Sequence, residues 1–86
     1  MARIEMYTTQ FCPYCVRAKR LLQERGLTYE EFDVGDDDEL RMRTVERSGG
    51  RRTVPQIFID DRSIGGYDEL AQLDASGELA VLTGVR

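Results

Sequence analysis

The sequence contains no histidine, and only two of its 86 residues are cysteine. The lack of histidine matters because a closed zinc or iron–sulfur site normally takes four protein ligands. Two thiols supply half of such a set, and carboxylates, outside ligands or a second chain would have to complete it. We therefore expect no bound metal.

Long apolar runs and an excess of basic residues are also missing. No run approaches the roughly 18 apolar residues that a membrane-spanning helix needs, and the first ten residues, MARIEMYTTQ, contain no apolar signal core. The net charge of −4 argues against general nucleic-acid binding. We expect a cytoplasmic protein that binds neither membranes nor nucleic acids.

The length and the hydrophobic pattern indicate one small α/β domain over residues 1–86, which we expect to be a monomer. Alternating apolar residues and glycine-rich breaks predict the order β-α-β-α-β-β-α-α. The first two strands, joined by a helix, should pair in parallel, and the last two should form an antiparallel hairpin. The result is a mixed four-stranded sheet flanked by helices, with strands at 3–8, 28–34, 54–60 and 63–65 and helices at 12–25, about 35–47, about 68–75 and around Leu79 and Leu82.

Charges are unevenly distributed along the second predicted helix. Three acids, at 36–38, lie in its first turn, where the helix dipole favours negative charge, and we prefer this explanation to a metal site. Between 41 and 52 there are five arginines and one acid. This basic patch is either a solvated helix face or a site for a small anionic ligand.

The two cysteines, Cys12 and Cys15, lie three residues apart within TTQFCPYCVRAKRLL. A disulfide across so short a loop restrains the unfolded chain little, so a structural crosslink is a poor explanation. Pro13 suits the first position of a helix, and the N–H groups that follow, including that of Cys15, should point toward the Cys12 sulfur. These dipoles favour a thiolate at Cys12, which predicts Cys12 as nucleophile and Cys15 as the resolving thiol.

Three motifs in this order resemble the glutaredoxin family, specifically the bacterial dithiol members: CPYC at 12–15, TVPQIFI at 53–59 and IGGYDEL at 64–70. The resemblance covers essentially the whole chain. It implies a thioredoxin-like fold and a glutathione-dependent thiol–disulfide oxidoreductase. Glutathione would be a reducing co-substrate and not a tightly bound cofactor, and the partners would be disulfide-containing or glutathionylated proteins.

The resemblance also implies a glutathione site and a cis-proline at Pro55 that faces the dithiol. In the family pattern, Gly66 and Tyr67 contact the γ-glutamyl carboxylate, Asp68 accepts from its ammonium, and Arg41 meets the glycine carboxylate. From the residues alone, Pro55 would be the first residue of an edge strand and Asp68 a helix N-cap. The implied set is Tyr14, Arg41, Thr53, Val54, Pro55, Gly66, Tyr67 and Asp68.

Two residues depart from the family pattern. Thr9 stands where many relatives have a lysine, which removes a charge near the thiolate, and Tyr67 replaces a third cysteine. Two alternatives therefore stay open: a redoxin reduced by a thioredoxin reductase, and a carrier that holds an iron–sulfur cluster between two chains with glutathione. The sequence does not indicate which proteins are reduced.

Overall fold

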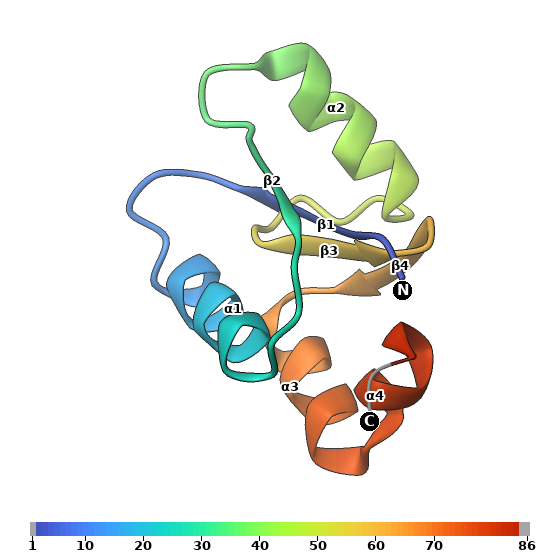
Figure 1. The fold of residues 1–86 in the computed structure, drawn as a ribbon. Helices are drawn as coiled ribbons and strands as arrows, with labels where there is room; N and C mark the ends of the chain where they lie inside the picture. The colour runs from blue at the N-terminus through green and yellow to red at the C-terminus, as the bar shows by residue number, and fades with distance from the viewer. Residues whose placement is uncertain (1, 85–86) are drawn as a thin grey trace.

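The computed structural model describes residues 2–84, and its centre is one mixed four-stranded sheet (Figure 1). The strand order across the sheet is β2-β1-β3-β4, and β1 and β3 are therefore the two inner strands. The strands are β1 (Ile4–Thr8), β2 (Glu30–Asp33), β3 (Gln56–Ile59) and β4 (Arg62–Gly65).

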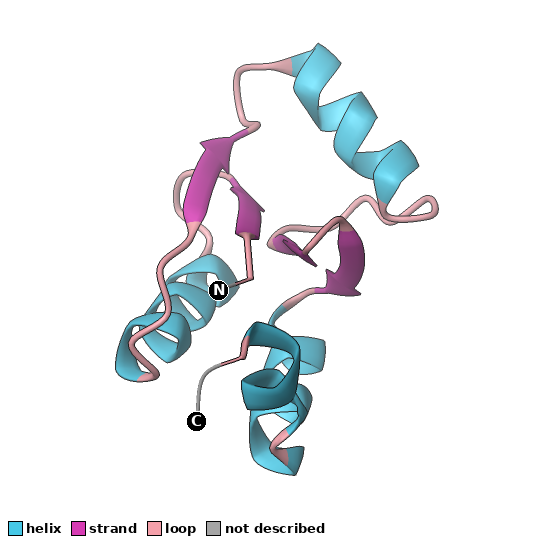
Figure 2. Cartoon of the chain, turned by 45° about the vertical axis from the view of Figure 1, so that its right-hand side comes forward, coloured by secondary structure: helices cyan, strands magenta, loops and turns pink. Residues whose placement is uncertain are grey.

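Helices cover both faces of the sheet. One face carries α2, and the other carries α1, α3 and α4; Figures 1 and 2 show α2 well apart from the other three. The bounds are α1 (Pro13–Glu24), α2 (Asp38–Arg47), α3 (Tyr67–Ser76) and α4 (Glu78–Thr83). Among residues 2–84, no helix has the length and apolar character needed to cross a membrane.

Strand pairing agrees with the expected topology. Strand β1 runs parallel to β2 and antiparallel to β3, and β3 pairs antiparallel with β4. The parallel pairing of β1 with β2 follows from the α1 crossover. The antiparallel hairpin of β3 and β4 is closed by the turn at Asp60 and Asp61, both of which have positive φ. The predicted mixed sheet and the predicted order of all eight elements are confirmed.

The two faces of the sheet pack against separate apolar clusters. Side chains alternate along a strand, so Ile4 and Met6 face α1 while Glu5 and Tyr7 face α2. The larger cluster lies under α1, α3 and α4, and the smaller one is formed by Tyr7, Val34 and Phe58. Because both faces are covered, all five residues of β1 are buried, including the charged Glu5.

The helix ends follow from local sequence. Asp37 caps α2 by accepting the Leu40 N–H at 3.0 Å, which confirms that the acids stabilise the start of this helix. Gly77 ends α3 with φ of 83°, as the sequence predicted. The second strand is shorter than the predicted 28–34, because its ladder runs only from Glu30, opposite Glu5, to Asp33.

Candidate functional site

Cys12 is the N-cap residue of α1. Its φ and ψ of −108° and 104° are extended, and Pro13 follows at the first helical position. The Cys12 sulfur accepts the N–H of Cys15 at 3.2 Å, and the Val16 N–H donates to the Cys12 carbonyl at 3.1 Å. The sulfur thus occupies the place of a capping oxygen, at the positive end of the helix dipole.

Cys15 lies one turn further into α1 and is 2% exposed, whereas Cys12 is half-buried. Burial raises the pKa of the Cys15 thiol to about 12, and the adjacent Cys12 sulfur adds to the shift. The Thr9 backbone and Lys19 oppose this shift without cancelling it. The two thiols therefore have different environments: one is accessible and capped by N–H donors, and the other is enclosed and protonated at neutral pH.

The peptide bond between Val54 and Pro55 is cis, as the resemblance implied. The Val54 carbonyl oxygen lies 3.8 Å from the Cys12 sulfur, which is the reach of a weak S–H···O contact. A Cβ built on Gly66 would meet the Pro55 carbonyl at 3.4 Å. The glycine therefore lets the start of α3 approach the cis-proline closely.

A groove of about 320 Å³ lies between the start of α1, the cis-proline turn and the start of α3. Seven of the eight residues that the resemblance assigned to glutathione line it; Arg41, on α2, does not. The lining consists of Tyr14, Arg51, Thr53, Val54, Pro55, Gly66, Tyr67, Asp68 and Glu69.

Two tyrosines form one wall of this groove. The rings of Tyr14 and Tyr67 lie with centroids 6.4 Å apart at an angle of 38°, and the Arg17 guanidinium lies 5.2 Å from the Tyr14 centroid. Tyr67, which departs from the family pattern, therefore packs beside Tyr14. An aromatic wall suits the apolar methylene groups of a bound ligand.

Sequence reasoning missed the part that Glu69 plays at the site. Gly66, and not Asp68, is the N-cap of α3, and the Glu69 carboxylate accepts the Gly66 N–H at 2.7 Å. This hydrogen bond, together with Arg51 at 2.9 Å, holds the pKa of Glu69 below its ordinary value. The spacing of Gly66 and Glu69 is that of a capping box, which is the signal that could have found it.

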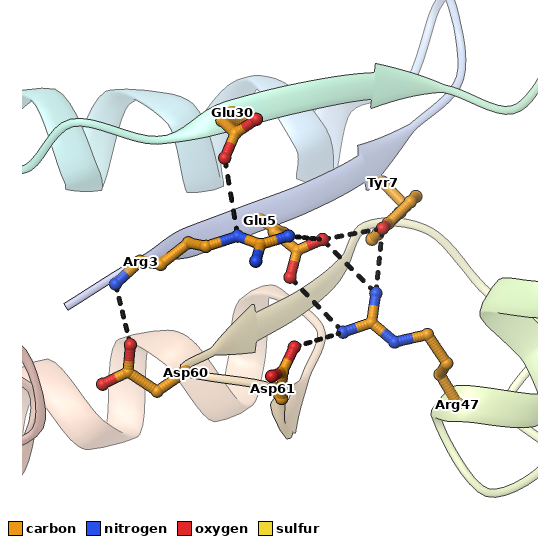
Figure 3. A network of polar contacts seen from close by, with 7 residues as sticks. All are labelled: Arg3, Glu5, Tyr7, Glu30, Arg47, Asp60 and Asp61. Carbon is orange, nitrogen blue, oxygen red and sulfur yellow. Dashed lines mark hydrogen bonds and ion pairs between the residues drawn. The ribbon is translucent and has the colours of Figure 1, made fainter.

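The arginines between 41 and 52 do not form one ligand-binding patch. Arg47 instead lies against the sheet face that α2 covers, where it donates to Tyr7 Oη at 2.9 Å (Figure 3). It also forms ion pairs with Glu5 at 3.3 Å and Asp61 at 3.4 Å. Arg43 pairs with Glu39 within α2. Three of the five, Arg43, Arg47 and Arg51, are therefore held in internal ion pairs.

Within residues 2–84, no group of three or more cysteine, aspartate or glutamate side chains is arranged to hold a metal ion. The acids at 36–38 extend from the turn before α2 into its first residue.

Comparison with known proteins gives a consistent result. The family model described as glutaredoxin matches residues 4–64. A probable glutaredoxin of Synechocystis sp. is 49% identical over 78 residues, which cover 91% of this chain and 72% of that protein. Glutaredoxin 3 of Escherichia coli is 49% identical over 79 residues, covering 92% of this chain and 94% of the relative.

Solved structures agree with the sequence relatives. The solution structure of a Brucella melitensis glutaredoxin is 45% identical with a TM-score of 0.84, covering 95% of this chain and 88% of that one. A buckwheat glutaredoxin–glutathione complex is 26% identical with a TM-score of 0.86, covering 94% and 76%. The chain has the thioredoxin-like fold and belongs to the glutaredoxin family, whose members are glutathione-dependent thiol–disulfide oxidoreductases.

Proposed function

We propose that Cys12 is the nucleophile and Cys15 the resolving thiol of a reductase for protein disulfides and glutathione mixed disulfides. The observation that carries this assignment is the hydrogen bond of 3.2 Å from the Cys15 N–H to the Cys12 sulfur at the start of α1. N–H donors and the helix dipole stabilise negative charge on that sulfur, and the thiolate is the reactive form.

With a protein disulfide, both thiols act. The Cys12 thiolate attacks one substrate sulfur, a Cys12–substrate disulfide forms, and the other substrate sulfur leaves as a thiolate. Cys15 then loses its proton and attacks Cys12, which releases the second substrate thiolate and leaves Cys12 and Cys15 oxidised. Two glutathione molecules return the two electrons and become glutathione disulfide.

With a glutathione mixed disulfide, Cys12 alone suffices. The Cys12 thiolate takes the glutathionyl group and releases the substrate thiol. A second glutathione then attacks the Cys12–glutathione disulfide, which regenerates Cys12 and forms glutathione disulfide. Neither histidine nor metal is needed, because the attacking and leaving groups are both thiolates.

The groove beside Cys12 is the proposed binding site of glutathione. Val54 lies just outside β3, so its backbone groups can pair with the cysteinyl part of an extended tripeptide, in the way that an added strand pairs with a sheet edge. The N-terminus of α3 at Gly66 and Tyr67 offers N–H donors to the γ-glutamyl carboxylate, and the exposed Asp68 carboxylate suits its ammonium. The buckwheat relative was solved as a glutathione complex, which supports glutathione as the ligand.

The glycine carboxylate of glutathione needs a cation. Arg41 was assigned to it by resemblance, and that role stays a prediction, because Arg41 is not in the groove lining. Arg51 lines the groove, paired with Glu69 at 2.9 Å. We propose Arg51 as a second candidate, and separate alanine variants of the two arginines distinguish them through the KM for glutathione.

The activity is assigned to a monomer in the cytoplasm. All the proposed groups come from a single chain, so a second subunit is not required to complete the site. The cytosol keeps thiols reduced, which is the state in which a disulfide reductant works.

The test is reduction of the mixed disulfide of glutathione and 2-mercaptoethanol, coupled through glutathione reductase, on three proteins. Wild type should be active, Cys12→Ser inactive, and Cys15→Ser active. With a protein disulfide as substrate, Cys15→Ser should lose turnover, because the mixed disulfide with Cys12 cannot be resolved from within the protein.

An inactive Cys15→Ser variant on the small mixed disulfide would contradict the one-thiol branch. Turnover that depends on thioredoxin reductase and not on glutathione would contradict the glutathione assignment as a whole. The same assay, run with each reducing system in turn, separates these outcomes.

A further inference from the structure

Exposed apolar side chains gather around the nucleophile. Five large hydrophobic side chains are exposed in the described part of the chain, and three of them, Phe11, Tyr14 and Val16, lie within four residues of Cys12. Phe11 is the extreme case at 98% exposed, and Val16 is 51% exposed. Clustered apolar surface beside a reactive group is typical of a binding surface.

The backbone of Phe11 adds to the case. Its φ is 57°, in the left-handed region that residues other than glycine, asparagine and aspartate rarely occupy. Its ring gains nothing from burial in this structure. Phe11 thus has an unfavourable backbone conformation and a fully exposed ring, and it directly precedes the nucleophile. Because neither feature stabilises the fold, they indicate a functional role for this side chain.

Phe11 and Val16 line a second hollow, of about 480 Å³, that includes Cys12. This hollow shares no lining residue with the groove assigned to glutathione. The start of α1 separates the two, so the nucleophile has a site for glutathione on one side and an unassigned hollow on the other.

The charges in this hollow restrict what it can hold. Lys19 pairs with Glu31 at 2.8 Å, and Glu31 also accepts from the Thr8 hydroxyl at 2.8 Å. Asp33 accepts the Gly35 N–H at 2.7 Å and has no cationic partner among residues 2–84. Two carboxylates against one ammonium leave the hollow negative, which favours a neutral or basic ligand over an acidic one.

We propose that this hollow docks the polypeptide of disulfide-bearing protein substrates, with an apolar side chain next to the substrate cysteine packed on Phe11 and Val16. The proposal rests on the proposed function, because a substrate joined to Cys12 by a mixed disulfide must place its neighbouring residues within a few ångströms of that sulfur. A basic residue nearby would meet Asp33. The glutathionyl group carried by Cys12 occupies the groove on the other side.

The test compares variants of Phe11 on two classes of substrate. Phe11→Asn removes the ring but retains a residue that tolerates positive φ, and Phe11→Tyr retains the ring. Val81→Ala, which truncates a 79% exposed side chain on α4, is the control for loss of apolar surface elsewhere. One substrate is the mixed disulfide of glutathione and 2-mercaptoethanol. The other two are synthetic peptides, each with one internal disulfide. The cysteines are flanked by leucine and lysine in one peptide and by aspartate in the other.

For each protein we compare kcat/KM for the leucine–lysine peptide with kcat/KM for the small mixed disulfide. Phe11→Asn should lower this ratio by about tenfold, mainly because the KM for the peptide rises. Phe11→Tyr and Val81→Ala should leave this ratio within about twofold of wild type. Wild type should prefer the leucine–lysine peptide to the aspartate peptide, and Phe11→Asn should reduce that preference.

An unchanged ratio in Phe11→Asn would overturn the proposal. Equal losses on both substrate classes would also overturn it, because they would show that Phe11 acts only by shaping the backbone at Cys12. If wild type itself failed to reduce the small mixed disulfide, the proposed function and this docking surface would both be wrong.

Discussion

Two chemically identical thiols lie in different environments because of where α1 places them, and we propose that this difference gives them different roles. Cys12 is at the N-cap, where the Cys15 N–H donates to its sulfur, and Cys15 is one turn later, against the core. The start of the helix thus presents an N–H donor to one sulfur, and packing against the core excludes water from the other. The sequence predicted this difference, because Pro13 and the three-residue spacing fix the start of the helix.

The raised pKa of Cys15 predicts how the resolving step depends on pH. Burial is the largest cause of this shift, and it remains when Cys12 is joined to a substrate. The rate of resolution should rise with pH across the neutral and mildly alkaline range, by up to about tenfold per unit, as the Cys15 thiolate fraction grows.

This rate can be measured by stopped-flow release of a chromogenic thiol from a mixed disulfide preformed on Cys12. The Cys15→Ser variant is the control and should show no intramolecular release. A rate that does not change with pH over this range would contradict a protonated Cys15.

At the scale of elements, one arginine links α2 to the sheet through an ion pair. Arg47, in the last turn of α2, reaches the buried Glu5 of β1 (Figure 3). Its guanidinium carbon also lies 4.0 Å from the centroid of the Phe58 ring of β3. Burial by itself would raise the pKa of Glu5, but hydrogen bonds from Arg47 and Tyr7 and the charge of Arg3 outweigh it and lower the pKa below 4.5. Glu5 therefore remains charged inside the fold.

Glu5→Gln should lower the free energy of unfolding at neutral pH by about 1–3 kcal/mol, because it removes the buried carboxylate that pairs with Arg47. The loss is no larger because the Arg47 side chain is one-third exposed, and solvent weakens its ion pair with Glu5. Urea unfolding of wild type and variant measures the difference. Asp61→Asn is the matched control and should cost less than about 0.5 kcal/mol, since the Asp61 side chain is 80% exposed.

The Glu5 contribution should also depend on pH. Its pKa is lower in the folded chain than in the unfolded chain, so the contribution is complete above the unfolded value of about 4.5 and is lost as pH falls through the folded pKa. The stability difference between wild type and Glu5→Gln should therefore shrink on acidification below about pH 5. A difference that stays constant into strong acid would contradict a lowered pKa for Glu5.

The start of α3 depends on a glycine pair. Gly65 has φ of 115°, and a methyl group there would collide with the Arg51 guanidinium and the Glu69 carboxylate. Gly65→Ala should lower the free energy of unfolding by about 1–3 kcal/mol and raise the KM for glutathione, because it displaces the capping arrangement at Gly66.

Gly77→Ala is the control for this variant. Gly77 also has positive φ, at 83°, but a methyl group there meets nothing within 4 Å. It should lower stability without changing the KM for glutathione. Equal effects of the two variants on that KM would contradict a specific role for Gly65 at the groove.

At the scale of the whole molecule, local patterns predicted most of the fold. Three local signals predicted elements that the structure contains: the alternation of Ile4 and Met6 in β1, Pro13 at the start of α1 and Gly77 at the end of α3. The second strand was predicted too long, because its ends depend on pairing with the five residues of β1 and not on its own sequence. The resemblance, and not the composition, indicated the cis bond at Pro55.

What the sequence could not predict are contacts between distant segments. Arg47 and Glu5 are 42 residues apart, and no local signal pairs them; Arg47 therefore looked like part of a solvated or ligand-binding patch. The two hollows beside Cys12 are likewise formed by segments distant in sequence. The groove joins residues 14, 51–55 and 66–69, and these come together only when the sheet forms.

The central claim is that Cys12 carries the glutathionyl group with the tripeptide in the groove of Val54, Gly66 and Asp68. A crystal structure of the Cys15→Ser variant, loaded as its glutathione mixed disulfide, tests it most directly. The account predicts glutathione bonded to Cys12, with its cysteinyl backbone beside Val54 and its γ-glutamyl carboxylate at the start of α3. Glutathione lying in the hollow beside Phe11 and Val16, with the groove empty, would contradict it.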